Sequence, residues 1–341
     1  MGQMWHPDDY LEALYRSIKP EFRFRAQSEA EWGVWRSELK ERLAASLGGF
    51  PDNAADLQPK LVEEVDCGAY VRQRVELVTF PGLTMPVYVL VPARRDGRLP
   101  AVVACHGHGY GSKEITNLRP DGVSAAMEPG YQRHFAVELA KRGFVVIVPE
   151  LLGFGDRRTK AEADGDGYSS CHEISTYLLQ LGLTMAGHRV YETIRAVDYA
   201  ARRPEIDPER IGCMGISGGG LVASFAAALD ERLKAVVVSG YVNTFRASIL
   251  SVHHCVDNYI PGLLRYAEQP DIVGLIAPRP LLVESGTDDP IFPLSAADEA
   301  CGQIAAVYRL LGEEEKFARD TFEGGHVISG AQAYDWLLRW L

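Results

Sequence analysis

The chain lacks features that would direct it to a membrane, a secretory route or a disulfide-rich fold. No apolar run is long enough to span a bilayer, and the first 20 residues lack the basic segment followed by an apolar segment that defines a signal peptide. The six cysteines among 341 residues form no Cys-x-x-Cys pair. We therefore expect a cytoplasmic protein whose cysteines are reduced and buried in the core.

Positive charge is also scarce. The 35 lysines and arginines are outnumbered by 46 aspartates and glutamates, which gives a formal net charge of -11. Such a chain repels phosphate backbones and anionic lipids, so we expect neither nucleic acid nor a membrane as a partner. A small-molecule substrate fits this charge better, and self-association into a homo-oligomer stays open.

The hydrophobic pattern changes period along the chain. Apolar residues at helical spacing predict helices over residues 8–19 and 28–47, and alternation in "VRQRVELVTF" and "TMPVYVLVP" predicts an antiparallel hairpin. Short apolar runs then alternate with helical stretches, among them 131–142, 173–202, a helix from 218, and 296–311. This rhythm predicts an α/β fold with an open, mostly parallel, doubly wound sheet, helices on both faces and an antiparallel hairpin at its N-terminal end.

The same pattern predicts the domain organisation. Residues 1–60 form an N-terminal helical extension, and residues 61–341 form the sheet-containing domain. Two polar or irregular stretches, 151–172 and 241–278, interrupt the alternation of strands and helices. Loops of that length in a compact domain are usually functional, so we expect both to shape a binding site.

One serine lies between glycines where an apolar strand gives way to a helix. In "GCMGISGGG", Gly215, Ser217 and Gly219 form G-x-S-x-G, the nucleophile elbow that exposes a serine hydroxyl at the start of a helix. The alternative is that Ser217 only caps the helix, with glycines for close packing. The strand before it and the alanine-rich helix after it favour the nucleophile.

Acid and base candidates follow in the order that this elbow predicts. Asp288 and Asp289 lie in the loop after "RPLLVESG", and His326 lies between Gly324-Gly325 and the last helix. A histidine takes the proton of the serine, and an aspartate orients that histidine. We prefer Asp289 to Asp288 for the second role, although the sequence leaves both open.

The glycine-rich loop "CHGHGYGS" faces the elbow across the carboxyl edge of the sheet. We expect the amides of His108 and Gly218 to form an oxyanion hole. Metal ligands are the alternative for the histidines, since His106 and His108 could combine with residues of "VHHCVDN" (His253, His254, Cys255, Asp257). These residues follow no regular ligand spacing, so we expect no metal and no cofactor.

Residues 60–341 resemble the α/β-hydrolase superfamily, and within it the branch of dienelactone hydrolases and acetyl xylan esterases. The resemblance is carried by "HGHGYGS", "VPELLGFGDR", "RAVDYAARRPEIDPERIGCMGISGGG", "IAPRPLLVESGTDDPIFP" and "GGH". It implies Ser217 as nucleophile, Asp289 as acid, His326 as base, and an oxyanion hole at His108 and Gly218.

Two departures refine this resemblance. Dienelactone hydrolases proper carry a cysteine at the elbow, so Ser217 favours ordinary ester chemistry. Glu150 stands where other members of the branch often have an aspartate, and we expect Glu150 and Arg157 to be structural ion partners rather than catalytic groups.

The sequence thus predicts a serine carboxylesterase that acts through an acyl-enzyme. Its expected substrates are short-acyl, acetyl-type esters of carbohydrate-like or small alcohols. The alternatives are a peptidase or lactonase of the same fold, or a non-catalytic binding scaffold. A peptidase of the prolyl oligopeptidase type is disfavoured because about 60 residues cannot form the propeller that precedes its hydrolase domain.

Overall fold

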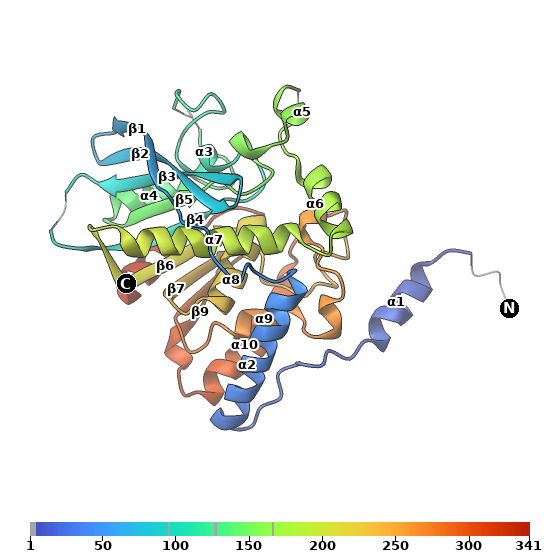
Figure 1. The fold of residues 1–341 in the computed structure, drawn as a ribbon. Coiled ribbons are helices and arrows are strands. Elements are labelled where there is room, and N and C mark those ends of the chain that lie inside the picture. Colours follow the sequence, from blue (N-terminus) through green and yellow to red (C-terminus); the bar gives the residue numbers. More distant parts are fainter. Residues whose placement is uncertain (1–4, 95, 126–127, 166) are drawn as a thin grey trace.

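A computed structural model describes residues 5–94, 96–125, 128–165 and 167–341, so residues 1–4 of the expected extension and residue 166 of the first expected loop lie outside the described part. Within these ranges nine strands form one sheet, in the order β1-β2-β3-β5-β4-β6-β7-β8-β9 (Figure 1). The strands are β1 (Lys60–Asp66), β2 (Tyr70–Phe80), β3 (Leu83–Pro92), β4 (Leu99–Cys105), β5 (Val145–Pro149), β6 (Ile206–Ile216), β7 (Leu233–Ser239), β8 (Leu281–Gly286) and β9 (Phe317–Phe322).

The pairing of the strands confirms the predicted fold class. From β5 to β9 every neighbouring pair is parallel, whereas β1, β2, β3 and β5 pair antiparallel. The order reverses around β4, so the loops after β4 and β6 leave the same edge at a switch point of the topology. This edge is where ligands bind in open α/β sheets.

The N-terminal hairpin is one strand larger than the sequence suggested. The expected hairpin is β2–β3, and β1 adds an antiparallel edge strand through pairs such as Lys60 with Glu76. Most residues of β1 are exposed, and four of its seven residues, in "KLVEEVD", are charged. Charged side chains on an edge strand disfavour pairing with another chain.

Helices cover both faces of the sheet because successive strand residues point to opposite sides. In β4, Val103 and Cys105 enter one core, while Val102 and Ala104 enter the other. The first core packs against α2 (Glu29–Ser46), α7 (Met185–Arg202), α8 (Gly218–Leu229), α9 (Gln269–Gly274) and α10 (Leu294–Leu310). The second core packs against α4 (Phe135–Lys141) and α11 (Ala333–Trp340).

The prediction of one long helix over 173–202 is wrong. Two helices, α6 (Cys171–Gln180) and α7, are separated by a turn in which Gly182 has a φ of +75°. Thr184 then caps α7, because its hydroxyl accepts a hydrogen bond from the amide of Gly187 at 2.9 Å. A glycine with positive φ followed by a capping threonine ends one helix and begins the next. A prediction based on apolar periodicity alone does not detect this break.

The segments expected to be loops contain short helices. Residues 151–172 include η1 (Gly155–Arg157), α5 (Lys160–Ala163) and the first residues of α6, and α3 (Ser112–Ile115) follows the loop after β4. The stretch 241–278 contains η2 (Val256–Asn258), η3 (Leu263–Arg265) and α9, and η4 (Glu314–Lys316) precedes β9. Within the described ranges, no helix has both the length and the apolar character needed to cross a bilayer.

The first helix, α1 (Asp8–Ser17), lies apart from the sheet (Figure 1). It contacts the 241–278 stretch: Tyr15 donates a hydrogen bond to Glu268 at 3.1 Å, and Arg246 binds Glu12 at 2.7 Å. The N-terminal residues therefore make two kinds of contact. Helix α1 packs on the 241–278 stretch, and α2 packs on the sheet core through Trp35, Leu39 and Leu43.

Candidate active site

Ser217 occupies a strained turn between β6 and α8. Its φ of 57° and ψ of −126° are rarely adopted by a residue with a side chain, and such strain concentrates at functional sites. Ser217 stands at the N-cap position of α8, but its side chain makes no capping hydrogen bond. The hydroxyl is thus not used in the way that the helix-cap alternative requires.

The two glycines of the motif are needed for space. A Cβ at Gly215 would lie 2.2 Å from the carbonyl oxygen of Gly219. A Cβ at Gly219 would lie 2.1 Å from the carbonyl oxygen of Cys105. Both distances are far shorter than van der Waals contact, so the turn closes only if both positions lack side chains.

We expect Gly219→Ala to lower the free energy of unfolding by at least about 2 kcal/mol, because the new methyl group meets two backbone carbonyls that cannot rotate away. Gly302→Ala is the matched control: Gly302 lies in α10, where a Cβ would meet no atom of the described residues within 4 Å, and alanine there should stabilise the helix by up to about 1 kcal/mol. Urea denaturation of both variants measures the change in the free energy of unfolding. Equal stability of the two variants would show that the elbow is not tightly closed.

The histidine and one aspartate are in contact. Nδ1 of His326 lies 2.7 Å from Oδ2 of Asp289. The other carboxylate oxygen, Oδ1, accepts hydrogen bonds from the amides of Ile291 and Phe292 at 2.9 and 3.0 Å. Burial alone would raise the pKa of Asp289, but the hydrogen bond and charge of His326 outweigh it and lower that pKa. Asp288 is exposed and accepts a hydrogen bond from Thr287 at 3.1 Å. Of the two candidates, Asp289 is therefore the one placed to orient His326.

Two aromatic rings hold the imidazole of His326 on both sides. Tyr131 and Phe292 each stack on it, with ring centroids 5.6 Å away. Nε2 of His326 is buried and makes no hydrogen bond within the described part of the chain. The ring is thus fixed with its second nitrogen available to take a proton.

The turn that carries Ser217 and the ring of His326 both lie next to the end of β7. The amide of Ser217 donates to the carbonyl of Ser239 at 3.0 Å, and the next residue, Gly240, has a φ of +51°. A Cβ at Gly240 would lie 3.0 Å from Cε1 of His326 and 3.6 Å from Oδ2 of Asp289. Three segments far apart in the sequence therefore approach one another at the carboxyl edge of the sheet.

The two residues expected to supply oxyanion amides are neighbours. A Cβ at Gly218 would lie 3.2 Å from Cε1 and Nδ1 of His108, so the imidazole ring of His108 covers the start of α8. The amide of Gly218 is the first of the helix and has no acceptor inside it. Tyr131, which no sequence motif marks, donates a hydrogen bond to the carbonyl of His108 at 2.6 Å. Tyr131 therefore contacts both the loop that carries His108 and the ring of His326.

Glu150 and Arg157 are buried, but each has its own partner. Arg157 binds both carboxylate oxygens of Glu192, at 2.5 and 2.6 Å, and reaches only the backbone carbonyl of Glu150. The carboxylate of Glu150 accepts the amide and hydroxyl of Ser112 at 2.8 and 2.7 Å. It thereby holds the start of α3, directly after the loop that carries His108.

A second polar cluster adjoins this site. It consists of His108, Cys171, Cys255 and Asp257. The sequence alone marks three of these as possible metal ligands, and only Cys171 is new. Cys171 begins α6, and its pKa is lowered to about 5 by a hydrogen bond from Cys255 and by the charge of Arg189, although burial opposes this. All six cysteines are free thiols; Cys67 and Cys255 are only half-buried, contrary to the expectation of core positions.

Glu284 lies beneath the loop that follows His326 and gives this region a pH dependence. Its carboxylate accepts the amide of Gly330 at 2.8 Å, and burial raises its pKa to about 7 from 4.5. The folded state then binds this proton more tightly than the unfolded state, so the stability it contributes is full below pH 4.5 and is lost as the pH rises through about 7.

We therefore expect Glu284→Gln to stabilise the protein above pH 7, by at most about 3 kcal/mol, and to change little below pH 4.5. The glutamine oxygen can still accept the amide of Gly330, while no charge remains buried. Thermal unfolding of both proteins across this pH range is the measurement. A difference that does not depend on pH would mean that Glu284 does not titrate in this range.

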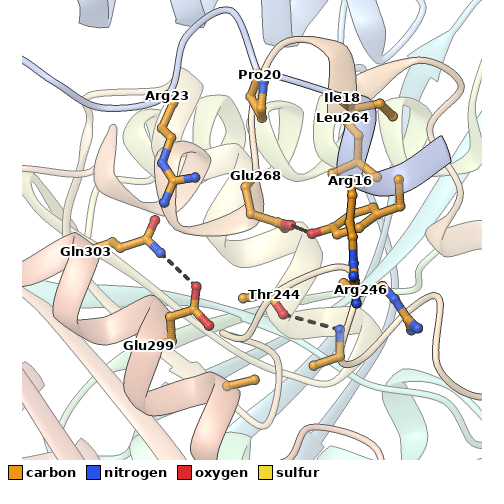
Figure 2. Close-up of a pocket in the computed structure, with 13 residues that line it drawn as sticks. Arg16, Ile18, Pro20, Arg23, Thr244, Arg246, Leu264, Glu268, Glu299 and Gln303 are labelled. Carbon is orange, nitrogen blue, oxygen red and sulfur yellow. Dashed lines mark hydrogen bonds between the residues drawn. The ribbon is translucent and has the colours of Figure 1, made fainter. Parts of the chain in front are cut away.

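A cavity of about 450 Å³ lies between the N-terminal segment and the 241–278 stretch (Figure 2). Its lining is charged and includes Arg16, Arg23, Arg246, Glu268 and Glu299. Ser217, Asp289 and His326 are not among the described residues that line it. This cavity is therefore separate from the site at Ser217, Asp289 and His326.

Comparisons with known proteins agree with this architecture. The model of the Abhydrolase family matches residues 8–317. The "Putative hydrolase YtaP" of Bacillus subtilis is 31% identical over 317 residues, which cover 90% of this chain and 100% of that protein.

Solved structures show the same fold at lower identity. A "putative acetyl xylan esterase" of Bacteroides fragilis has a TM-score of 0.78 at 19% identity and covers 94% of this chain and 83% of its own. A glucuronoyl esterase of Solibacter usitatus has a TM-score of 0.64 at 15% identity and covers 92% of each chain. The sheet order, the elbow at Ser217 and the family match lead to one conclusion: this chain belongs to the Abhydrolase family, within the α/β-hydrolase superfamily.

Proposed function

We propose that the protein is a serine carboxylesterase with Ser217 as nucleophile, His326 as base and Asp289 as the orienting acid. The observation that carries the proposal is the 2.7 Å contact between His326 and Asp289 at the sheet edge where a strained, positive-φ turn holds Ser217. A serine that only caps a helix needs neither this backbone strain nor a half-buried imidazole at the same edge of the sheet.

The geometry supports a two-step reaction. Nε2 of His326 takes the proton of Ser217 as its Oγ attacks the ester carbonyl, and the amides of Gly218 and His108 stabilise the oxyanion. His326 then protonates the leaving alcohol, which departs and leaves an acyl group on Ser217. A water molecule, activated by the same imidazole, releases the acid and restores the serine. None of these steps requires a cofactor.

The substrate class is the finer part of the proposal. Structures of this fold include proteins named as acetyl xylan and glucuronoyl esterases. We assign short-acyl, acetyl-type esters of carbohydrate-like or small alcohols, with residues 151–172 and 241–278 forming the walls that select them. The acidic chain, with a formal charge of -11, favours a neutral ester over an anionic one.

A series of nitrophenyl esters of increasing acyl length tests both parts. We expect hydrolysis that is fastest for acetate and falls with chain length, together with release of acetate from acetylated xylan. A fluorophosphonate should label Ser217, located by peptide mass spectrometry. Hydrolysis only of lactones or peptides would support the alternatives within this fold, and a folded protein that neither hydrolyses nor is labelled would contradict an enzymatic role.

A further inference from the structure

A four-residue cluster next to the oxyanion loop has the composition of a metal site. His108 comes from the loop after β4, Cys171 from the first residue of α6, and Cys255 and Asp257 from the 241–278 stretch. One ligand atom from each lies within 4.8 Å of every other. These three segments are separated by more than 60 residues at each step, so the local spacing in the sequence could not reveal the cluster.

The distances suit tetrahedral coordination. Around a zinc ion, sulfur, nitrogen and oxygen ligands lie about 3.3 to 3.8 Å from one another. Nε2 of His108 and Oδ2 of Asp257 are 3.2 Å apart. The other separations, all under 4.8 Å, need to shrink by at most about 1 Å to enclose an ion.

The imidazole of His108 already points Nε2 into the cluster. Nε2 is buried and forms an ion pair with Oδ2 of Asp257 at 3.2 Å, although this contact lacks the geometry of a hydrogen bond. A metal ion bound at Nε2 would take the place of the proton that this ion pair requires on the imidazole. Its other side faces Gly218, so the ring is held between the elbow and the cluster.

Arg189 lies next to the cluster and supplies a positive charge to it. It donates to Oδ2 of Asp257 at 2.5 Å and to Sγ of Cys171 at 3.2 Å, and Asn258 donates to Oδ1 of Asp257 at 2.7 Å. Such outer hydrogen bonds orient ligands in metal sites. Two thiolates and a carboxylate carry three negative charges, which one divalent ion and one guanidinium neutralise.

We propose that His108, Cys171, Cys255 and Asp257 bind one tetrahedrally coordinated metal ion of the zinc class. Two sulfur ligands exclude magnesium and calcium, which prefer oxygen, and select zinc or a similar soft ion. All four positions are filled by protein, as in structural sites, and binding displaces the protons of the thiols and of His108. The ion ties the oxyanion loop to α6 and to the 241–278 stretch. The proposal does not depend on the esterase activity, and it replaces the expectation of no metal drawn from sequence spacing.

Cobalt(II) provides a spectroscopic test in the full-length protein, reduced and freed of metal with a chelator. We expect one equivalent of cobalt to give a thiolate charge-transfer band and the intense visible bands of tetrahedral cobalt, and zinc to abolish both. Cys171→Ser and Cys255→Ser should each lose this spectrum. Cys67→Ser, which removes a thiol outside the cluster, should keep it.

Several results would contradict a metal site at this cluster. Absence of cobalt binding, a weak octahedral spectrum, or a spectrum that survives Cys171→Ser and Cys255→Ser would overturn the proposal. So would a disulfide between Cys171 and Cys255 that persists in the purified protein after reduction. Where a cysteine variant fails to fold, X-ray absorption of the zinc-loaded wild-type protein decides: two sulfur ligands support the site, and a shell of only nitrogen and oxygen refutes it.

Discussion

Replacing Ser217 by alanine is expected to lower kcat for nitrophenyl acetate by about 10⁴-fold or more, with only a small effect on KM. The elbow places this side chain at the start of α8, where it makes no capping hydrogen bond, so its loss should remove the proposed nucleophile without removing a cap of the helix. Residual hydrolysis should come from the oxyanion amides and from substrate binding alone.

Ser224→Ala is the matched control for this experiment. Ser224 lies on the same helix, is buried, and hydrogen-bonds only to the carbonyls of Gly220 and Leu221 among the described residues. Its substitution should leave kcat within about twofold of wild type, since it touches none of the reacting groups. Ester hydrolysis that persists in Ser217→Ala at the rate of Ser224→Ala would show that another residue is the nucleophile. Circular dichroism of both variants confirms that each is folded.

The fold was predictable because it depends on local patterns. Continuous apolar runs such as "AVVAC" and "FVVIVP" correspond to β4 and β5, whose residues are buried on both faces. The edge strand β1 was not separated from the hairpin because its mostly charged, exposed residues give a weak apolar signal. The break between α6 and α7 is hidden in the apolar pattern, because the apolar periodicity continues across Gly182 and Thr184.

The site was predictable only in part, and the reason is geometric. Ser217 and His326 stand in motifs with local glycine signals, whereas the choice between Asp288 and Asp289 depends on which carboxylate the turn before Pro290 points inward. Tyr131 has no motif of its own, and its role follows from a contact with His108 across 23 positions of the sequence. Cys171 likewise has no local signal, because its neighbours in the cluster are distant in the chain.

Asp289→Asn should have a kcat about 10³- to 10⁴-fold lower than that of Asp288→Asn. Oδ1 of Asp289 accepts the amides of Ile291 and Phe292, so an asparagine at this position keeps its oxygen there and turns its amino group toward His326. That amino group donates to Nδ1, which forces the proton of the imidazole onto Nε2. His326 in this tautomer cannot accept the proton of Ser217.

Asp288→Asn serves as the control because it is equally conservative and one residue away. Asp288 is exposed, and its side chain accepts only from Thr287 among the described residues, so kcat should stay within about twofold of wild type. Steady-state hydrolysis of nitrophenyl acetate by both variants is the measurement. If Asp288→Asn were the variant that lost activity, the contact between Asp289 and His326 would be structural, and Asp288 would be the acid.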